Sequence, residues 1–217
     1  MSATYHPESN RFQVSDPHFK QVYRKKILRR LAKRYGPLLY HHVNFSVSTD
    51  IMASMVKKMD KKKPRRGEVV MVIPNAKDQI WLHTKGFYPN GVYRLMTGGI
   101  DPGEAPEEAL KRETMEETGF TVEIAQCLAV VTYTLTNEQS TLPFVSYVFQ
   151  TQPVEGTPTP IDSGEAIDGF RAVSVETLLD TTQRLRQLEG NFADWGYFRA
   201  ITHELTARVL LQNQSFR

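Results

Sequence analysis

The sequence predicts an α/β protein, in which a mixed β-sheet carries helices on both faces and follows a basic, mainly helical N-terminal extension. Strand-like runs rich in β-branched and aromatic residues have helical segments before, between and after them. With 217 residues and 40% apolar composition, the chain can bury the core of one domain with an appendage. Residues 1–66 hold 16 basic and 4 acidic residues, a net charge of +12, whereas residues 67–217 hold 11 and 20, a net charge of −9.

The first predicted element is a basic amphipathic helix over residues 16–36. Asp16 suits the N-cap, Pro17 the first helical position and Gly36 the position after the last turn. The apolar residues of this segment form one stripe, which consists of Ile27, Leu28, Leu31, Ala32 and Tyr35. A second short helix is expected over residues 50–59, and the segment between the two helices is extended or irregular.

The basic residues of the first helix allow two interpretations. A cluster of Lys and Arg can contact nucleic acid, polyphosphate or a membrane surface. It can also be the solvated outer face of a helix that docks on the acidic part of the chain or on a second subunit. We favour docking, because charge runs usually face solvent and no base-reading motif lies nearby. Pro64 and Gly67 in the following basic segment indicate a boundary, so the predicted domains are residues 1–66 and residues 67–217.

Beyond this boundary, strands are predicted over residues 67–74, 78–85, 91–100, 121–135, 142–152 and 165–174. The turn signal Asn-Ala-Lys-Asp joins the first two. Helices are predicted over residues 174–185 and 193–212. The last helix carries an apolar stripe that we expect in the core, formed by Trp195, Phe198, Ile201, Leu205 and Val209.

The composition excludes several kinds of protein. Cys127 is the single cysteine, which rules out an internal disulfide and a cysteine-based zinc site and favours a reducing compartment. No apolar run reaches the length of a membrane span, and the N-terminal residues lack the apolar core of a signal peptide. We therefore expect a soluble, cytoplasmic protein without a membrane span.

A strongly acidic helix is predicted over residues 106–118. Pro106 suits its first position and Gly119 its end, although Ala105 lacks a capping oxygen. Three carboxylates, those of Glu113, Glu116 and Glu117, fall within about 100° of one another on the face that should pack inward. By themselves the three glutamates are also typical of an exposed acidic helix face. If the face packs inward, like charges repel, especially when desolvated, and the face needs a counter-ion. Arg112 cannot neutralise three carboxylates, whereas a divalent cation can, and an all-oxygen ligand set selects Mg²⁺ or Mn²⁺.

A glycine-rich loop with Gly98, Gly99 and Gly103 joins the preceding strand to this helix, and its backbone can turn toward an ion or a phosphate. The whole stretch fits the pattern Gly-x5-Glu-x7-Arg-Glu-U-x-Glu-Glu-x-Gly-U, in which U is aliphatic. The matching positions are Gly98, Glu104, Arg112, Glu113, Glu116, Glu117 and Gly119. The chain therefore resembles the Nudix hydrolases. It departs from their pattern at Thr114, where an aliphatic residue is usual, and in "LMTGG", where "LPGG" is commoner.

This resemblance implies an α/β/α sandwich that hydrolyses a nucleoside diphosphate linked to another group, with water attacking phosphorus. It implies that Glu113, Glu116 and Glu117 hold Mg²⁺ together with the carbonyl of Gly98, and that Arg112 and Glu104 orient the ligands. Phosphoryl transfer requires neutralised charge and an activated water, which clustered metal ions supply. Lys85 and Arg94, together with Glu104, are assigned to the substrate side.

The general base and the substrate stay open. Glu165, just before a predicted strand, is the favoured base, and Glu138, Asp168 or a glutamate of the motif are the alternatives. The expected partner is a nucleotide-derived small molecule, such as ADP-ribose, a nucleotide sugar or a nucleoside triphosphate. A homodimer is possible. The alternative function is a nucleotide-sensing or RNA-binding protein that uses basic residues within 20–66.

Overall fold

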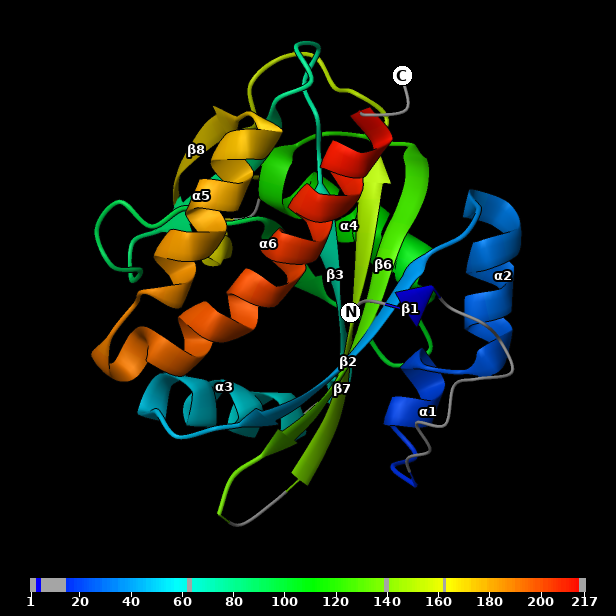
Figure 1. The fold of residues 1–217 in the computed structure, drawn as a ribbon, viewed down its shortest axis with the longest axis vertical. Helices are drawn as coiled ribbons and strands as arrows, with labels where there is room; N and C mark the ends of the chain where they lie inside the picture. Colours follow the sequence, from blue (N-terminus) through cyan, green and yellow to red (C-terminus); the bar gives the residue numbers. More distant parts are fainter. Residues whose placement is uncertain (1–2, 5–14, 62–63, 139–140, 162, 215–217) are drawn as a thin grey trace.

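A mixed β-sheet forms the centre of the fold in the computed structural model, which describes residues 3–4, 15–61, 64–138, 141–161 and 163–214 (Figure 1). Within these residues the strand order is β1 (Ala3–Thr4), β2 (Leu39–Ser46), β6 (Ile124–Thr136), β7 (Thr141–Thr151), β3 (Gly67–Val72) and β5 (Met96–Gly99). The pairs β2/β6 and β7/β3 are parallel, and the other neighbours are antiparallel. A second, two-stranded sheet pairs β4 (Ile80–Lys85) with β8 (Ile167–Val173) in antiparallel orientation.

Helices cover both faces of the large sheet, as predicted. On one face lie α1 (Phe19–Val22), α2 (Lys25–Tyr35) and α4 (Pro106–Thr118), and on the other lie α3 (Asp50–Lys61), α5 (Val175–Arg186) and α6 (Ala193–Gln214). The side chains of strand β3 alternate between the hydrophobic cores on the two faces of the sheet. Val69 and Met71 join the first core, Val70 and Val72 join the second, and all four are fully buried.

The single helix predicted over residues 16–36 is wrong, because the chain breaks into α1 and α2 at Tyr23 and Arg24, which are both extended. The Tyr147 hydroxyl donates a 2.6 Å hydrogen bond to the carbonyl of Val22, so a side chain satisfies the end of α1. The N-cap of α1 is His18 rather than the predicted Asp16, but Asp16 still contributes a side-chain oxygen to this end, since its Oδ1 accepts from the Phe19 amide at 2.7 Å.

The segment between the two predicted N-terminal helices is a full strand. β2 pairs with β6 in parallel over eight residues, from Leu39 opposite Ala129 to Ser46 opposite Thr136. Docking of α2 is also confirmed, because Leu28 and Leu31 are fully buried in the core that contains Val130. Residues before the expected boundary thus share the sheet and the core, while the boundary near Gly67 itself stays a prediction.

The remaining elements agree with the sequence, apart from the third strand, which is shorter than the predicted residues 91–100. Along α6, Trp195, Phe198, Ile201 and Leu205 are buried as expected, and Val209 is partly buried. Two short 3₁₀ turns, Ser163–Glu165 and Gly190–Phe192, precede β8 and α6. None of the helices described is long and apolar enough to cross a membrane.

Candidate active site

The site begins where the edge strand β5 runs into the glycine loop and α4. The predicted bounds of α4 are confirmed, with Gly119 in the left-handed conformation at φ +72° just after the last turn. Ala105 supplies no capping oxygen, but the Glu108 carboxylate reaches back and accepts from the Ala105 amide at 3.0 Å. One half of a capping box therefore starts the helix.

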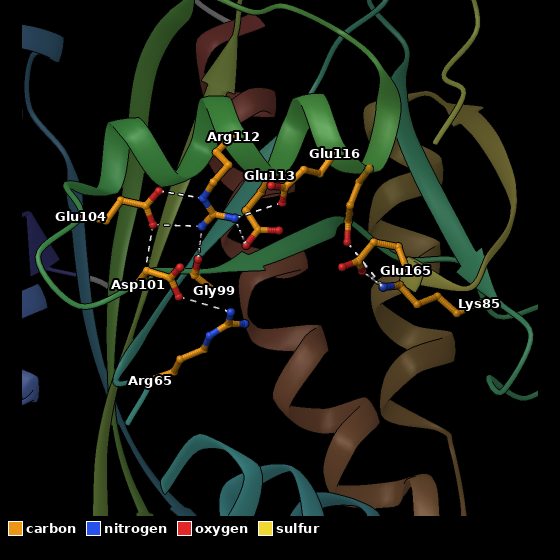
Figure 2. Close-up of polar contacts among 10 residues, drawn as sticks. Arg65, Lys85, Gly99, Asp101, Glu104, Arg112, Glu113, Glu116 and Glu165 are labelled. Carbon is orange, nitrogen blue, oxygen red and sulfur yellow. Dashed lines mark hydrogen bonds and ion pairs between the residues drawn. The ribbon is translucent and has the colours of Figure 1, made fainter. Parts of the chain in front are cut away.

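Arg112 ties the loop to the helix (Figure 2). Its Nε and Nη2 donate to the two oxygens of Glu104 at 2.8 and 2.9 Å, and Nη2 also donates to the Gly99 carbonyl at 2.9 Å. Nη1 donates to Glu113 at 2.9 Å and to Glu116 at 3.0 Å. Burial by itself would raise the pKa of Glu104, but the hydrogen bonds from Arg112 and from the Asp101 amide outweigh it and lower that pKa. One guanidinium thus contacts two carboxylates of α4 and the carboxylate of Glu104 in the loop, and these contacts fix the helix against the loop.

Glu113 lies directly over Gly98. A Cβ atom on Gly98 would lie 2.0 Å from Cγ of Glu113, so only glycine lets this carboxylate turn inward. Glu113 is 6% exposed, and burial raises its pKa despite the hydrogen bond from Arg112. The loop glycine and the buried glutamate are therefore one structural unit.

Glu117 is the most deeply buried carboxylate of the motif, with 1% exposure. Burial raises its pKa to about 7, and the positive charges of Lys85 and Arg94 oppose that rise. Lys85 Nζ lies 3.5 Å from Oε1. His83 Nδ1 lies 3.8 Å from Oε2, but burial and nearby cations hold the pKa of His83 well below its usual value, so the imidazole is neutral and the contact is no ion pair. Among the described residues, Oε2 has no hydrogen-bond partner.

The donor chemistry of this face fits a hard divalent cation. Two buried carboxylates with raised pKa values and an unpartnered oxygen form a surface in which oxygen donors predominate, with the neutral imidazole of His83 at 3.8 Å from Glu117 Oε2. Within the described ranges, however, no three acidic, His or Cys side chains converge on one point as a preformed metal site. The reason is visible in the contacts, since Glu113 and Glu116 are hydrogen-bonded to Arg112, and Glu117 faces Lys85.

The candidate bases are placed very differently. Glu165 lies in the turn before β8 and accepts from Lys85 Nζ at 2.7 Å, which brings it to the amine that also approaches Glu117 (Figure 2). Glu138 is exposed just beyond the end of β6. Asp168 is exposed on β8. The structure therefore brings Glu165 and Lys85 together with the motif, whereas the role of Glu165 stays a prediction.

Glu104 and Arg94, the other two residues predicted to lie on the substrate side, both contact other groups of the protein. Glu104 is occupied by Arg112, and Arg94 is buried, donating from Nε to the Tyr88 hydroxyl at 2.8 Å and from Nη1 to Thr97 at 3.1 Å. Thr97, which replaces the usual proline of the loop, thus holds Arg94. Sequence reasoning missed Arg65, which contacts Asp101 at 3.3 Å, and His83. Arg65 belongs to the basic run that we interpreted as a boundary, and nothing in the local sequence singles out His83.

Comparisons with known proteins locate this motif in a family. The family model for the NUDIX domain matches residues 64–195. Among curated proteins, Nudix hydrolase 19 of Arabidopsis thaliana is 39% identical over 54 residues, which are 25% of this chain and 12% of that protein. An RNA pyrophosphohydrolase of Erythrobacter litoralis is 44% identical over 43 residues, 20% of this chain and 26% of that protein. A NAD-capped RNA hydrolase of Schizosaccharomyces pombe is 36% identical over 55 residues, 25% of this chain and 15% of that protein.

The aligned segments thus span only 12% to 26% of the length of these curated relatives. Among solved structures, the MutT protein of Methanosarcina mazei Go1 is 23% identical, with a TM-score of 0.48 and coverage of 68% of this chain and 96% of that chain. The dihydroneopterin triphosphate pyrophosphohydrolase of E. coli is 13% identical, with a TM-score of 0.45 and coverage of 61% and 94%.

Proposed function

The chain belongs to the Nudix family and is a Nudix hydrolase, and from this premise we propose that it is a Mg²⁺-dependent pyrophosphohydrolase. It cleaves a nucleoside diphosphate linked to another group, such as ADP-ribose, a nucleotide sugar or a nucleoside triphosphate. The observation that carries the proposal is the buried Glu117 carboxylate, whose Oε2 has no hydrogen-bond partner in the described part of the chain. An unpartnered buried carboxylate oxygen is costly unless a ligand satisfies it.

Each residue of the motif has a part in this reaction. Glu113, Glu116 and Glu117, with the carbonyl of Gly98, would hold Mg²⁺, and Mn²⁺ is the alternative. The bound cation supplies neutralisation of phosphate charge and a more acidic water. Arg112 holds the loop and helix in register through Glu104 and Gly99, which keeps the ligand oxygens in place before substrate binds.

Glu165 is the proposed general base. Its carboxylate takes a proton from the attacking water, the water oxygen bonds to phosphorus, and the bond from phosphorus to the bridging oxygen breaks. The 2.7 Å hydrogen bond from Lys85 holds this carboxylate on the side of Glu117. Lys85 Nζ lies between the two carboxylates, and we propose that it also meets the substrate phosphate.

The test is a hydrolysis panel of ADP-ribose, nucleotide sugars, dinucleoside polyphosphates, NADH, nucleoside triphosphates and capped RNA, with Mg²⁺ and with EDTA, in which the phosphomonoester or phosphate products are separated and quantified. We expect hydrolysis of at least one substrate class in Mg²⁺ alone, and loss of about a hundredfold or more of turnover in Glu117→Gln. Full turnover of Glu117→Gln at saturating Mg²⁺ contradicts the ligand assignment. No activity across the panel contradicts the proposed reaction.

A second candidate function is polyanion binding by the basic face of α2. Its exposed cations include Lys25, Lys26, Arg29, Lys33 and Arg34. Arg30 on the same helix pairs with Glu107 of α4. A salt-dependent RNA titration separates this function from a purely solvated face, because phosphate contacts weaken steeply as salt rises.

We also propose that the protein works in the cytoplasm. Its single cysteine, Cys127, is buried and unpaired with another cysteine, which favours a reducing environment.

A further inference from the structure

A pocket of about 570 Å³ lies beside the glycine loop, between α3 and the sheet. Met55 and Lys58 of α3 line it, together with Arg65, Glu68 of β3 and Arg199 of α6. Gly98 and Gly99 of the loop close it on the side of the motif. Pockets of this size hold small ligands, and this one is built in part by residues that precede the matched NUDIX domain at residue 64.

The lining of the pocket is strongly cationic. It contains Lys58, Arg65, Arg94 and Arg199, and Glu68 is the carboxylate among the residues lining it. Glu68 is already neutralised, because Arg199 Nη1 donates to its two oxygens at 3.0 and 2.9 Å and Ser146 donates to it at 2.8 Å. Lys58, Arg65 and Arg94 remain. Arg65 also contacts Asp101 at 3.3 Å, outside the lining, so the lining itself keeps a positive potential, which attracts an anionic group.

Arg199 carries donors that the described part of the protein leaves poorly satisfied. Its side chain is buried, and its Nε has no hydrogen-bond partner among the described residues. Its Nη2 meets the sulfur of Met55 at 3.7 Å, and a thioether is a weak acceptor. A buried guanidinium in this state favours a ligand that brings oxygen acceptors.

The pocket and the motif glutamates meet at the same stretch of backbone. A Cβ on Gly99 would lie 2.6 Å from Nη1 of Arg65, so this guanidinium rests on the loop. A Cβ on the neighbouring Gly98 would lie 2.0 Å from Glu113. Arg65 and Glu113 therefore contact consecutive loop residues, and the pocket begins at the same two glycines, so a substrate cleaved at the glutamates has room to extend into it.

We infer that this pocket binds a further phosphate group of the substrate, and that Lys58 and Arg65 determine specificity for nucleoside polyphosphates over substrates with an uncharged sugar at that end. The inference rests on the proposed hydrolysis for its substrate class. Apolar side chains such as Met55 and Phe144 in the lining accommodate the uncharged part of the same group. The helix α3 is then a specificity element of the active site.

The binding experiment uses the full chain in EDTA, with inorganic tripolyphosphate as the calorimetric probe. We expect Lys58→Ala and Arg65→Gln each to weaken binding about tenfold, the loss typical of one charge-assisted contact. Lys57→Ala is the matched control, since it removes an exposed lysine of the same helix that does not line the pocket. Equal affinities for Lys58→Ala, Arg65→Gln and the unmodified protein overturn the inference, as does an equal loss in Lys57→Ala.

The kinetic experiment compares a nucleoside triphosphate with ADP-ribose in Mg²⁺. We expect Lys58→Ala to raise KM for the triphosphate about tenfold with little change in kcat, and to leave KM for ADP-ribose unchanged. An equal change for both substrates overturns the specificity assignment. The two proposals can fail separately. If tripolyphosphate binding depends on Lys58 but the protein hydrolyses no substrate, the result supports the phosphate-binding pocket and contradicts the proposed hydrolysis.

Discussion

Replacing Glu117 by glutamine tests how much the buried carboxylate costs the metal-free fold. Burial raises the pKa of Glu117 from 4.5 to about 7, so the folded chain holds a proton that the unfolded chain releases between these values. Because the folded state binds more protons there, its stability is highest below pH about 4.5 and falls as pH rises toward about 7. At about 1.4 kcal/mol for each pKa unit, the loss is on the order of 3 kcal/mol.

Glutamine does not titrate, so this part of the pH dependence disappears in Glu117→Gln. The amide has its own hydrogen-bonding needs, but they are the same at both pH values and cancel in the comparison. We expect the free energy of unfolding of the variant, relative to the unmodified protein, to increase by about 2.5 kcal/mol between about pH 5 and pH 8, because part of the full difference lies below pH 5.

The assay is urea denaturation in EDTA at both pH values, followed by the fluorescence of Trp81 and Trp195. Glu155→Gln is the matched control, because it makes the same chemical change at an exposed position. We expect the control to keep the pH dependence of the unmodified protein. Parallel pH dependences for Glu117→Gln and the unmodified protein would refute the reasoning, whatever the absolute stability of the variant.

Three further predictions concern the helix, the base and α2. Thr114→Val should raise stability by about 1 kcal/mol, seen as a Tm higher by about 2–4 °C, because Thr114 is fully buried and its hydroxyl has no partner in the described chain. Thr118→Val is the control and should lower Tm, since that hydroxyl donates to the Thr114 carbonyl at 2.6 Å; no rise in Thr114→Val contradicts the first expectation. Glu165→Gln should lower kcat about a hundredfold without changing the Mg²⁺ dependence, and a loss in Glu138→Gln instead moves the base to the hairpin. Leu28→Ala should lower the free energy of unfolding by about 3 kcal/mol, against little change in exposed Lys26→Ala, and equal stabilities of the two variants would show that the packing of α2 does not stabilise the fold.

Local sequence determined the helix that carries the chemistry. Pro106 and Gly119 bound α4 as predicted, because a proline suits the first turn and a glycine suits the left-handed end, and both effects act within a few residues. The inward direction of Glu113 and Glu117 follows from helical periodicity alone, which neighbouring elements do not alter. Glu116 lies on the same arc yet its side chain is 41% exposed, since its depth depends on what packs above the helix.

Tertiary contacts decided the surroundings of those carboxylates. Lys85 reaches Glu117 and Glu165 from β4, because β4 pairs with β8 beside the motif, and no spacing along the chain encodes that approach. Local sequence also could not predict the break in the first predicted helix, because that break depends on a distant residue. A continuous apolar stripe favours one helix, but the Tyr147 hydroxyl, 125 residues away in sequence, satisfies the Val22 carbonyl where the chain turns.

The cationic pocket shows most clearly the difference between what the sequence determines and what the tertiary structure determines. The sequence determined that Lys58 and Arg65 are charged and that the glycines permit a close backbone approach. Only the tertiary structure brought α3 and Arg199 of α6 to that loop, because β2 adds a strand to the sheet next to β6 and thereby positions the helix that follows it. Periodicity and capping act over a few residues, whereas the potential and the unsatisfied donors of a pocket depend on side chains that meet only when distant segments pack.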